Sequence, residues 1–600
     1  FFYDRPRVLS SLLKSINKRN DAITTTGNQS KIIVEHTNIN PNKAAHIGHL
    51  RNAVLGDTFI RILRATGVRV EVQNYIDNTG VQVADLVVGF LHIEQMMLDD
   101  VKALNDRLTN QTFDYYCWDL YARVGLFYRN EDPDANEDRE KLKLRAVVLQ
   151  RIESGNNPTA EMADYVAMQI VACHLNTMER LGIYYDLLPR ESEILHMHFW
   201  ERAFEQLKES GAIRFETEGR NANCWVMPTS AHDGTEEHDA DKIIVRSNGT
   251  VTYAGKDIAY QLWKLGKLRL DFNYRKFRTY SNGQVVWITT TQDCLDEKPD
   301  EKEERPSFGA GDAVFNVIDS RQSYTQTIVR QGVSAILGST HADEETRSVH
   351  LAYEMVALSP RACEELGLEL SEEDRLRTYV EMSGRKGLGV KADDLINKLE
   401  GEALREVRSR HPDLPLEEQI KTARAIATSA LRYFILKFTR NTVIAFDFNE
   451  ALAFEGETGP YCQYAAVRVG SIFRKLDREI QKSAEDFFNN LSTGNTEGAE
   501  RVRQILSGED GDNLWSIVTL SWRLDETIAQ AARMAEPAGI AKYTFALASA
   551  FSSFYTDRRN RIIDEPDEAR KATLIAITKV VLNSLTRALD LLGIEVPERM

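Results

Sequence analysis

The segment His46-Ile-Gly-His49 is the sharpest chemical signal in this 600-residue sequence. It stands at the start of a segment with helical periodicity, and the first turn of a helix carries unpaired N–H groups and a partial positive charge. That environment suits phosphate groups, to which both imidazoles could donate hydrogen bonds. Gly48 has no Cβ and would let a flat purine approach the backbone. The motif therefore predicts a site for nucleotide phosphates.

A loop much farther along the chain also carries adjacent cations. It reads Met382-Ser-Gly-Arg-Lys-Gly387, so that Arg385 and Lys386 stand between two glycines. Such a loop could close over a leaving pyrophosphate and stabilise the negative charge that develops on it. Basic loops are common on protein surfaces. This loop therefore predicts chemistry only in combination with the histidine motif.

The histidine motif needs elements that hold it in place, and residues 31–75 have the pattern of a strand, a helix and a second strand. Lys31–Thr37 reads as a short apolar strand, 38–43 as a loop, 46–65 as a helix and 68–75 as the next strand. A helix that joins two parallel strands forms a right-handed crossover. Ligands of such sheets bind at the carboxyl ends of the strands, where the loop at 38–43 is expected.

The sequence pattern changes at about residue 400. Before this point, a mostly helical stretch at 95–210 is followed by a hairpin at 242–253, a helix at about 256–267 and a buried strand at 314–318. After this point, strand signals are few. Long amphipathic segments follow one another there, at 416–440, 460–482, 513–535, 540–563 and 568–592. This series of amphipathic segments with few strands predicts a second domain built as a helical bundle.

Composition excludes several protein classes. Hydrophobic residues make up 42% of the chain, which is enough for a core, and no run approaches the roughly 18 apolar residues of a membrane span. The six cysteines include no CxxC pair, which disfavours a disulfide framework or a zinc site and indicates a reducing compartment. The net charge of −16 would disfavour a nucleic-acid partner, yet five basic residues and no acid lie between Glu418 and Asp447. Such a cluster fits a solvated helix face equally well.

Taken together, the histidine motif and the basic loop resemble HIGH and KMSKS, the two hallmarks of class I aminoacyl-tRNA synthetases. The finer resemblance is to the arginyl-tRNA synthetase family, and it runs in collinear order from about residue 31 to residue 600. It rests on five segments. They are the strand, loop and HIGH helix at 35–52, the next strand end at 74–82, the amino-acid-site hairpin and helix at 245–259, and two motifs of the anticodon-binding domain at 458–464 and 588–600.

The resemblance implies an α/β fold with a Rossmann-type parallel-sheet catalytic domain that carries insertions, followed by an all-α anticodon-binding helical bundle. It places the catalytic domain at 31–398 and the bundle at 399–600, after a lead-in at 1–30. The N-terminal domain with which the family binds the tRNA elbow is not recognisable in this lead-in. Residues at about 271–312 have no counterpart that we can place, and we expect them to be an insertion.

The resemblance also implies an ATP-dependent arginine–tRNA ligase that uses L-arginine, ATP with Mg²⁺ and tRNA(Arg), and needs tRNA for the activation step. The arginine carboxylate would attack the α-phosphorus of ATP, pyrophosphate would leave, and the terminal ribose hydroxyl of the tRNA would attack the adenylate. Positioning and charge stabilisation would supply the rate. The implied catalytic residues on the phosphate side are His46 and His49; the further ATP contacts are Gly48, Met382, Ser383 and Arg385, with His350 on the adenine side.

The basic loop departs from the family pattern. It begins with Glu381, and Gly384 stands where the second lysine of KMSKS is usual. Arginyl-type enzymes often lack that lysine and use one just before HIGH, and Lys43 stands at this position. Lys386 could also serve, and the sequence does not choose between the two catalytic candidates.

Arginine itself sets demands on a pocket. Its guanidinium is planar and permanently charged and presents five N–H donors, so it needs a carboxylate in a defined geometry. Asp257 lies four residues after Tyr253, on the same face if a helix starts at Tyr253. The resemblance implies that Asp257 pairs with the guanidinium beside Tyr253, that Glu35 and Asn40 hold the α-ammonium group, and that Gln322 lines the arginine site. Without the resemblance, Asp257 would fit a carboxylate stabilised at a helix start.

Unpaired anticodon bases need aromatic platforms. The resemblance implies Tyr461, Tyr464 and Tyr555 for this role, together with the terminal Met600. A tyrosine on a helix is often a core residue, so this alternative stays open. The segment His196-Met-His198 has no third histidine or cysteine nearby, and we expect no dedicated metal site.

Three functions remain open from the sequence: an arginyl-tRNA synthetase, a class I relative that serves glutamate or glutamine, and a non-catalytic tRNA-binding paralogue. Asp257 disfavours the second, because a carboxylate would repel an acidic side chain. An intact HIGH motif with Lys43 disfavours the third. We expect a cytoplasmic monomer without a membrane partner.

Overall fold

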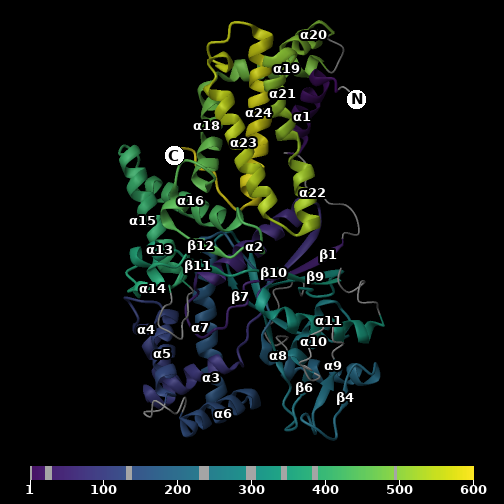
Figure 1. Ribbon diagram of the computed structural model, residues 1–600, viewed down its shortest axis with the longest axis vertical. Helices are drawn as coiled ribbons and strands as arrows, with labels where there is room; N and C mark the ends of the chain where they lie inside the picture. The colour runs from purple at the N-terminus through teal and green to yellow at the C-terminus, as the bar shows by residue number, and fades with distance from the viewer. Residues whose placement is uncertain are drawn as a thin grey trace, which may run out of the picture.

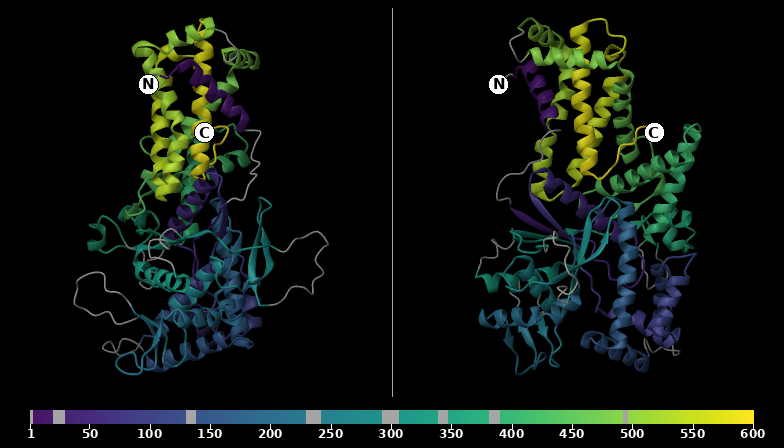
Figure 2. Two further views of the ribbon diagram at one scale, coloured as in Figure 1. Left: turned by 90° about the vertical axis from the view of Figure 1, so that its right-hand side faces the viewer. Right: turned by 180° about the vertical axis from the view of Figure 1, so that it is seen from behind.

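The computed structural model describes residues 3–19, 30–129, 138–228, 242–291, 306–338, 347–380, 390–491 and 496–600. A bundle of long helices lies at one end of the molecule and an α/β part at the other, as Figures 1 and 2 both show. The helix that carries the histidine motif, α2 (Ile47–Ala65), lies between these two parts (Figure 1).

A seven-stranded sheet forms the centre of the α/β part, within the described residues. Neighbouring strands are parallel, apart from the antiparallel pair at one edge. At the carboxyl end of β1, Glu35 pairs in register with Gln73 on one side and Asn316 on the other. The predicted strand–helix–strand unit is confirmed as β1, α2 and β2. In spatial order the strands are β10 (Ser348–Tyr353), β9 (Ala313–Asp319), β1 (Lys31–Glu35), β2 (Arg69–Gln73), β3 (Leu187–Leu188), β8 (Val285–Thr290) and β7 (Asn273–Thr279).

Two smaller cores flank the sheet, and each has its own helices. The first fills the connection between β2 and β3, with α3 (Val81–Val88), the π-helix η1 (Gly89–Ile93), α4 (Leu98–Arg107), α5 (Phe113–Phe127), α6 (Arg139–Ser154) and α7 (Pro158–Arg180). The second contains α8 (Glu191–His196), α9 (Phe199–Glu209), the strands β4 (Arg214–Phe215), β5 (Trp225–Met227) and β6 (Lys242–Val245), α10 (Tyr253–Lys264) and α11 (Ser323–Leu337). Figure 1 shows the two groups on opposite sides below the sheet.

The segment expected as an insertion, 271–312, contains part of the central sheet. Its strands β7 and β8 form the antiparallel edge, and β8 runs parallel to β3. The sequence could not show this pairing, because β3 comprises only Leu187 and Leu188 and is too short to have a periodicity. The remaining residues of this segment are described at 291 and 306–312.

Helices dominate the chain after the sheet. A short parallel pair, β11 (Val356–Leu358) and β12 (Ile444–Phe446), joins the sheet region to them. The helices are α13 (Pro360–Glu365), α14 (Glu372–Arg375), α15 (Ala392–Arg410), α16 (Leu416–Leu436), α17 (Phe448–Leu452), α18 (Gly459–Lys475), α19 (Arg478–Leu491), α20 (Thr496–Ile505), α21 (Gly508–Trp522), α22 (Leu524–Met534), α23 (Ala538–Thr556) and α24 (Glu568–Leu591). The predicted bundle is thus confirmed. Within the described residues, α24 is long and apolar enough to cross a membrane, but 72% of its most apolar window is buried in the bundle, as in a core helix.

Two predicted boundaries differ from the structure. The division at 398/399 falls inside α15, a continuous helix that packs along α16. The lead-in at 1–30 is not a separate element, since α1 (Arg5–Arg19) packs against α19, α20, α21 and α24 of the bundle (Figure 1). The Ser10 hydroxyl donates to the Phe488 carbonyl at 3.0 Å. The start of the described chain is therefore built into the C-terminal bundle.

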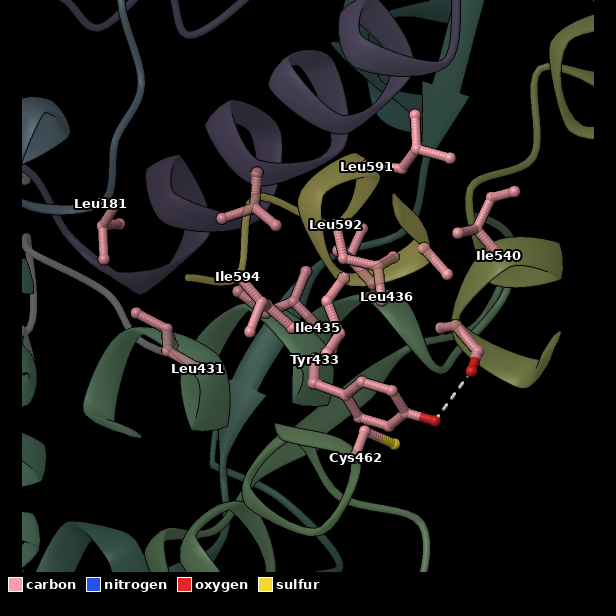
Figure 3. Close-up of a cluster of buried hydrophobic side chains, with 14 of the residues drawn as sticks. Leu181, Leu431, Tyr433, Ile435, Leu436, Cys462, Ile540, Leu591, Leu592 and Ile594 are labelled. Atoms are coloured by element: carbon pink, nitrogen blue, oxygen red, sulfur yellow. Dashed lines mark hydrogen bonds between the residues drawn. The ribbon is translucent and has the colours of Figure 1, made fainter. Parts of the chain in front are cut away.

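A fully buried arginine joins α2 to the bundle. Arg432 of α16 donates from Nη2 to Asp57 of α2 at 2.5 Å and from Nε to the Leu592 carbonyl at 2.6 Å. Figure 3 shows the apolar cluster beside it, where the Tyr433 hydroxyl donates to the Ala541 carbonyl at 3.0 Å. Arg432 belongs to the basic cluster noted in the sequence. In the structure it acts as a buried link and cannot contact a nucleic acid, whereas Lys421 and Arg424 of the same cluster are exposed.

The N-cap of α18 offers a test of local stability. Thr458 Oγ1 accepts from the Tyr461 N–H at 3.2 Å and donates to the Ala453 carbonyl at 2.6 Å. We expect Thr458→Ala to destabilise the bundle by about 1–2 kcal/mol because the cap is lost. That loss corresponds to a thermal midpoint about 2–4 °C lower. Thr458→Ser should keep most of the stability, and an alanine variant with an unchanged calorimetric midpoint would contradict the capping role.

Candidate active site

A cavity of about 900 Å³ opens at the carboxyl ends of β1, β2 and β9. This is the edge where ligands of parallel sheets bind, and β1 lies where the strand order reverses. The structure brings together predicted site residues that the sequence places up to 287 positions apart, from Glu35 to Gln322. The predicted site residues that line this cavity are Glu35, Asn40, Lys43, His46, Gly48, His49, Tyr253, Asp257 and Gln322.

The turn after β1 holds the cavity wall in a strained conformation. Thr37 and Asn38 have φ angles of 77° and 45°, in the left-handed region that residues with side chains rarely adopt. The Thr37 N–H donates to Asn52 Oδ1 at 2.5 Å, and the Asn38 N–H donates to Asn74 Oδ1 at 2.9 Å. Asn52 lies on α2 and Asn74 follows β2, so two neighbouring elements hold the turn. Strain of this kind persists only where the surroundings enforce it, and it is typical of functional sites.

The two histidines of the motif form one stacked pair at the start of α2. Their ring centroids are 3.6 Å apart, with 20° between the planes. His46 Nδ1 accepts from the Gly48 N–H and His49 Nδ1 accepts from the His46 N–H, both at 3.1 Å. A Cβ on Gly48 would lie 3.0 Å from the His46 ring, so the glycine also leaves room for this pair. With both Nδ1 atoms accepting, each neutral ring carries its proton on Nε2.

The histidines are uncharged at neutral pH. Burial, reinforced by the nearby Lys43, lowers the pKa of His46 to about 4. Burial and the neighbouring His46 hold the pKa of His49 well below its usual value. Two Nε2–H donors without net charge therefore sit at the amino end of α2, where the helix dipole favours anions.

Lys43 lies beside this pair against an aromatic wall. Its Nζ is 5.1 Å from the ring centroids of both Trp118 and Tyr121 on α5. Its carbonyl oxygen accepts from the His174 ring at 2.8 Å, which fixes the backbone. No local pattern indicates this wall, because α5 begins seventy positions after Lys43 and carries no motif of its own.

The basic loop lies outside the described residues, and with it Met382, Ser383, Arg385 and Lys386. The residues that border it are placed. Val380 pairs with Leu358, and Lys391 pairs with His46 in an isolated bridge beside the histidine motif. The chain therefore returns to the HIGH segment directly after the loop.

Carboxylates dominate the opposite side of the cavity, and Glu35 already has a partner there. Lys264 of α10 contacts Glu35 Oε2 at 2.5 Å and Asn316 Oδ1 at 2.8 Å. The Asn38 amide donates to the other Glu35 oxygen at 2.7 Å. Lys264 was not among the predicted residues. It neutralises Glu35 and leaves the remaining acids of the wall to determine the charge of the cavity.

Asp257 carries no ion pair with a described residue. It lies on α10 one turn after Tyr253, as predicted, and Tyr253 is 50% exposed at the start of that helix. Burial and the nearby Glu191 and Glu35 raise the pKa of Asp257 to about 7. An acid held in this way gains strongly from a cationic ligand, which would favour its charged form.

Sequence reasoning missed two further acids of this wall. Glu191 accepts from Lys256 Nζ at 2.5 Å and from the Tyr75 hydroxyl at 3.1 Å. Burial and Glu191 raise the pKa of Asp77 to about 8, and its Oδ1 is buried without a partner among the described residues. Asp77 stands in the strand-end motif 74–82 and could have been found there, whereas nothing in the sequence marks Glu191.

His350 lies on β10, outside the residues that line the cavity. Its Nε2 is 3.0 Å from the Ile318 carbonyl of the neighbouring β9. Among the described residues no further contact at this ring bears on adenine, so the adenine-side role stays a prediction.

The candidate anticodon residues gather on α18 and α23. Tyr464 is 38% exposed, whereas the Tyr461 hydroxyl donates to Ser552 at 3.2 Å. The Arg468 guanidinium lies 4.4 Å above the Tyr555 ring. Met600 is partly buried against the same core. Tyr464 thus has the most exposed of these rings, and the other side chains pack against their neighbours.

No three His, Cys, Asp or Glu side chains come together as a possible metal site in the part of the chain that the structure describes. His198 instead forms an exposed contact with Glu201 at 3.2 Å.

Comparison with known proteins agrees with the two-part architecture. Residues 9–292 match the family described as "tRNA synthetases class I (R), catalytic domain", and residues 462–600 match the DALR anticodon binding domain. Among curated relatives, the chain is 33% identical to an arginine–tRNA ligase of Pyrococcus furiosus, over 100% of this chain and 86% of the relative. It is 33% identical to that of Deinococcus radiodurans, over 95% and 83%, and 32% identical to that of Thermococcus kodakarensis, over 96% and 81%.

Among solved structures, the arginyl-tRNA synthetase of Thermus thermophilus superposes with a TM-score of 0.75 at 28% identity, over 99% of this chain and 86% of that one. The superposition includes the parallel sheet with the histidine motif and the helical bundle. The cavity has two neutral imidazoles at one side and carboxylates at the other, and the chain shares its fold with this structure and more than 30% of its full-length sequence with the curated relatives above. The chain therefore belongs to the arginine–tRNA ligase family of class I tRNA synthetases.

Proposed function

We propose that this protein activates L-arginine with ATP to arginyl-adenylate and transfers the arginyl group to the 3′ end of tRNA(Arg). The observation that carries the proposal is the division of one cavity into a phosphate side and a carboxylate side. An amino acid and ATP could lie across it with their reacting atoms adjacent, and such positioning is the main source of rate in phosphoryl chemistry.

The arginine side chain points to Asp257 in this proposal. Two parallel N–H donors of the guanidinium bind the carboxylate, and Tyr253 packs beside the plane. Glu35 and Asn40 hold the α-ammonium group, and Gln322 contributes a further polar contact. Glu35 retains acceptor capacity for this task, because a carboxylate has about four lone-pair sites and Lys264 and Asn38 use two of them.

ATP lies along the amino end of α2. His46 and His49 donate from Nε2 to its phosphates, Gly48 leaves room for the adenosine, and Lys43 stabilises the charge that passes to pyrophosphate. Met382, Ser383, Arg385 and Lys386 approach from the basic loop. Mg²⁺ arrives with the ATP phosphates, because this ion is usually bound through substrate phosphates and water.

The reaction proceeds in two displacements. An oxygen of the arginine carboxylate attacks the α-phosphorus, and pyrophosphate leaves with its bond electrons. A hydroxyl of the terminal tRNA ribose then attacks the carbonyl carbon of the adenylate, and AMP leaves. Tyr461, Tyr464, Tyr555 and Met600 contact the anticodon. The enzyme acts as a cytoplasmic monomer.

The direct test is aminoacylation of a tRNA(Arg) transcript with each of the twenty amino acids. Acylation with arginine alone is expected. Acylation with glutamate or glutamine would replace the proposal with another class I activity. Tight tRNA binding without any acylation would instead identify a non-catalytic paralogue.

Arginine binding should depend on pH through the carboxylate wall. The raised pKa values of Asp257, about 7, and Asp77, about 8, mean that these acids are largely protonated at pH 6 in the free protein. A guanidinium favours their charged forms, so binding releases protons and strengthens as the pH rises. We expect the arginine Kd to fall about tenfold per pH unit below pH 7 for each linked proton.

Calorimetric titration between pH 6 and pH 8 would measure this dependence. Asp257→Asn should make it shallower by the share of one proton, because the variant has no proton to release at that position and only Asp77 remains. A Kd that stays constant over this range in the parent protein would contradict the protonated carboxylate wall. His46 does not contribute, since its pKa of about 4 keeps it neutral throughout.

A further inference from the structure

A second cavity, of about 500 Å³, adjoins the active site. We call it the rim cavity. Its lining includes three basic residues, two tyrosines and a threonine: Arg220, Lys242, Arg246, Tyr253, Tyr324 and Thr325.

The rim cavity is continuous with the active-site wall. Tyr253 and Thr325 line both cavities, so one side chain at the start of α10 and one at the start of α11 separate them. Figure 1 shows β6, α10 and α11 close together on the same side of the sheet. A chain-like ligand with its end in the active site could therefore continue into the rim cavity.

The walls of the rim cavity are positively charged. Arg220, Lys242 and Arg246 line it, and no acid is found among its described lining residues. Within the described residues none of these three cations forms an ion pair, which contrasts with the many paired arginines elsewhere in the chain. Arg220 and Arg246 are exposed. Three cations without a carboxylate partner in the part of the chain that the structure describes can form a site for a polyanion.

The amino ends of two helices add to this field. Thr252, the N-cap of α10, donates its hydroxyl to the Ile243 and Ile244 carbonyls at 3.0 and 3.1 Å and makes no side-chain cap. Gln322, the N-cap of α11, makes no side-chain cap either. Both helices thus keep uncapped N–H groups near the cavity, and helix amino ends favour phosphate groups.

Exposed aromatic rings stand among these cations. Tyr324 is 43% exposed, and Lys242 Nζ lies 5.1 Å from its ring centroid. Tyr253 is 50% exposed at the border with the active site. Exposed tyrosines between cations are the combination that holds single-stranded nucleic acid, since rings stack with unpaired bases and cations contact the backbone.

We infer that the rim cavity binds the unpaired nucleotides that precede the terminal ribose of the tRNA, with phosphates at Arg220 and Arg246 and a base on Tyr324. The inference rests on the proposed function, which requires the terminal ribose to enter the active site. The volume suits one small organic group rather than a duplex. The base displaces the Lys242 ammonium from Tyr324 and leaves it free to contact a phosphate.

A cycle of protein and RNA variants tests this site. The binding of a full-length tRNA(Arg) transcript and of one that lacks its last three nucleotides is titrated at fixed ionic strength. The proteins are the parent, Arg220→Ala, Arg246→Ala and Tyr324→Ala. Arg202→Ala is the matched control. Arg202 is a half-buried arginine of the neighbouring α9 that pairs with Glu205 at 3.4 Å and lies outside the rim cavity.

Each arginine substitution should weaken the binding of the full-length transcript about three- to tenfold. It should also reduce the salt dependence of this binding by about one counterion. Tyr324→Ala should weaken it about tenfold through lost stacking. None of them should change the binding of the shortened transcript by more than about twofold, the precision of such a titration, since the contacted nucleotides are absent. Equal losses on both transcripts, or no loss on either, would overturn the rim-cavity assignment.

Arginylation by the parent protein separates this inference from the proposed function. A parent that does not arginylate its tRNA refutes the function itself. A parent that arginylates, with rim variants that behave like Arg202→Ala, refutes the rim cavity alone. Thermal midpoints equal to that of the parent show that the substituted surface side chains leave the fold intact.

Discussion

Lys43→Ala is expected to lower the rate of arginine activation by about 10²–10³-fold, the scale of losing one preorganised charge donor. The side chain lines the cavity beside the paired histidines, and the basic loop lacks the second lysine of its family pattern. The arginine affinity should barely change, because Lys43 lies on the phosphate side. Single-turnover formation of the adenylate, measured with tRNA present, gives the rate.

Two controls separate the charge from the position. Lys43→Arg keeps the cation and should retain more activity than the alanine variant. Lys386→Ala tests the loop lysine in the same assay. A loss below threefold for Lys43→Ala, with a severe loss for Lys386→Ala, would assign the role to the loop.

Asp257→Asn should lower kcat/KM for arginine by about 10²-fold or more, because a charge-assisted hydrogen-bond pair contributes about 3 kcal/mol. Lysine is cationic too, so charge alone cannot exclude it. A guanidinium offers two parallel N–H donors to one carboxylate, which an ammonium group cannot reproduce. Lysine would leave part of the hydrogen-bonding capacity of Asp257 unused, and sites built on buried hydrogen bonds reject such analogues strongly.

Citrulline, the neutral isostere of arginine, sharpens this test. Asp257→Asn should narrow the preference for arginine over citrulline, because the neutral amide no longer attracts the positive charge of arginine. ATP affinity should be unchanged. Arginine kinetics within threefold of the parent would show that Asp257 is only a helix-start carboxylate.

Local patterns predicted the phosphate side well. A buried strand, a loop with breakers and a capped helix are consecutive in the sequence, and the structure builds them as β1, the turn at Thr37 and α2. Tyr253 and Asp257 are one helical turn apart and share the cavity for the same reason. Short-range periodicity determines these relations.

The carboxylate side required tertiary contacts that no local pattern reveals. Lys264 reaches Glu35 across 229 positions, and Lys256 reaches Glu191 across 65. Their spacing in the sequence has no meaning until the sheet forms. The packing of α1 on the bundle and the pairing of β8 with the two-residue β3 escaped prediction for the same reason.

Arginine activation is tested most simply by ATP–pyrophosphate exchange with arginine, glutamate and glutamine, each with and without tRNA(Arg). We expect exchange with arginine, dependent on tRNA, and none above background with the two others. Robust exchange with glutamate and none with arginine would contradict the proposed function.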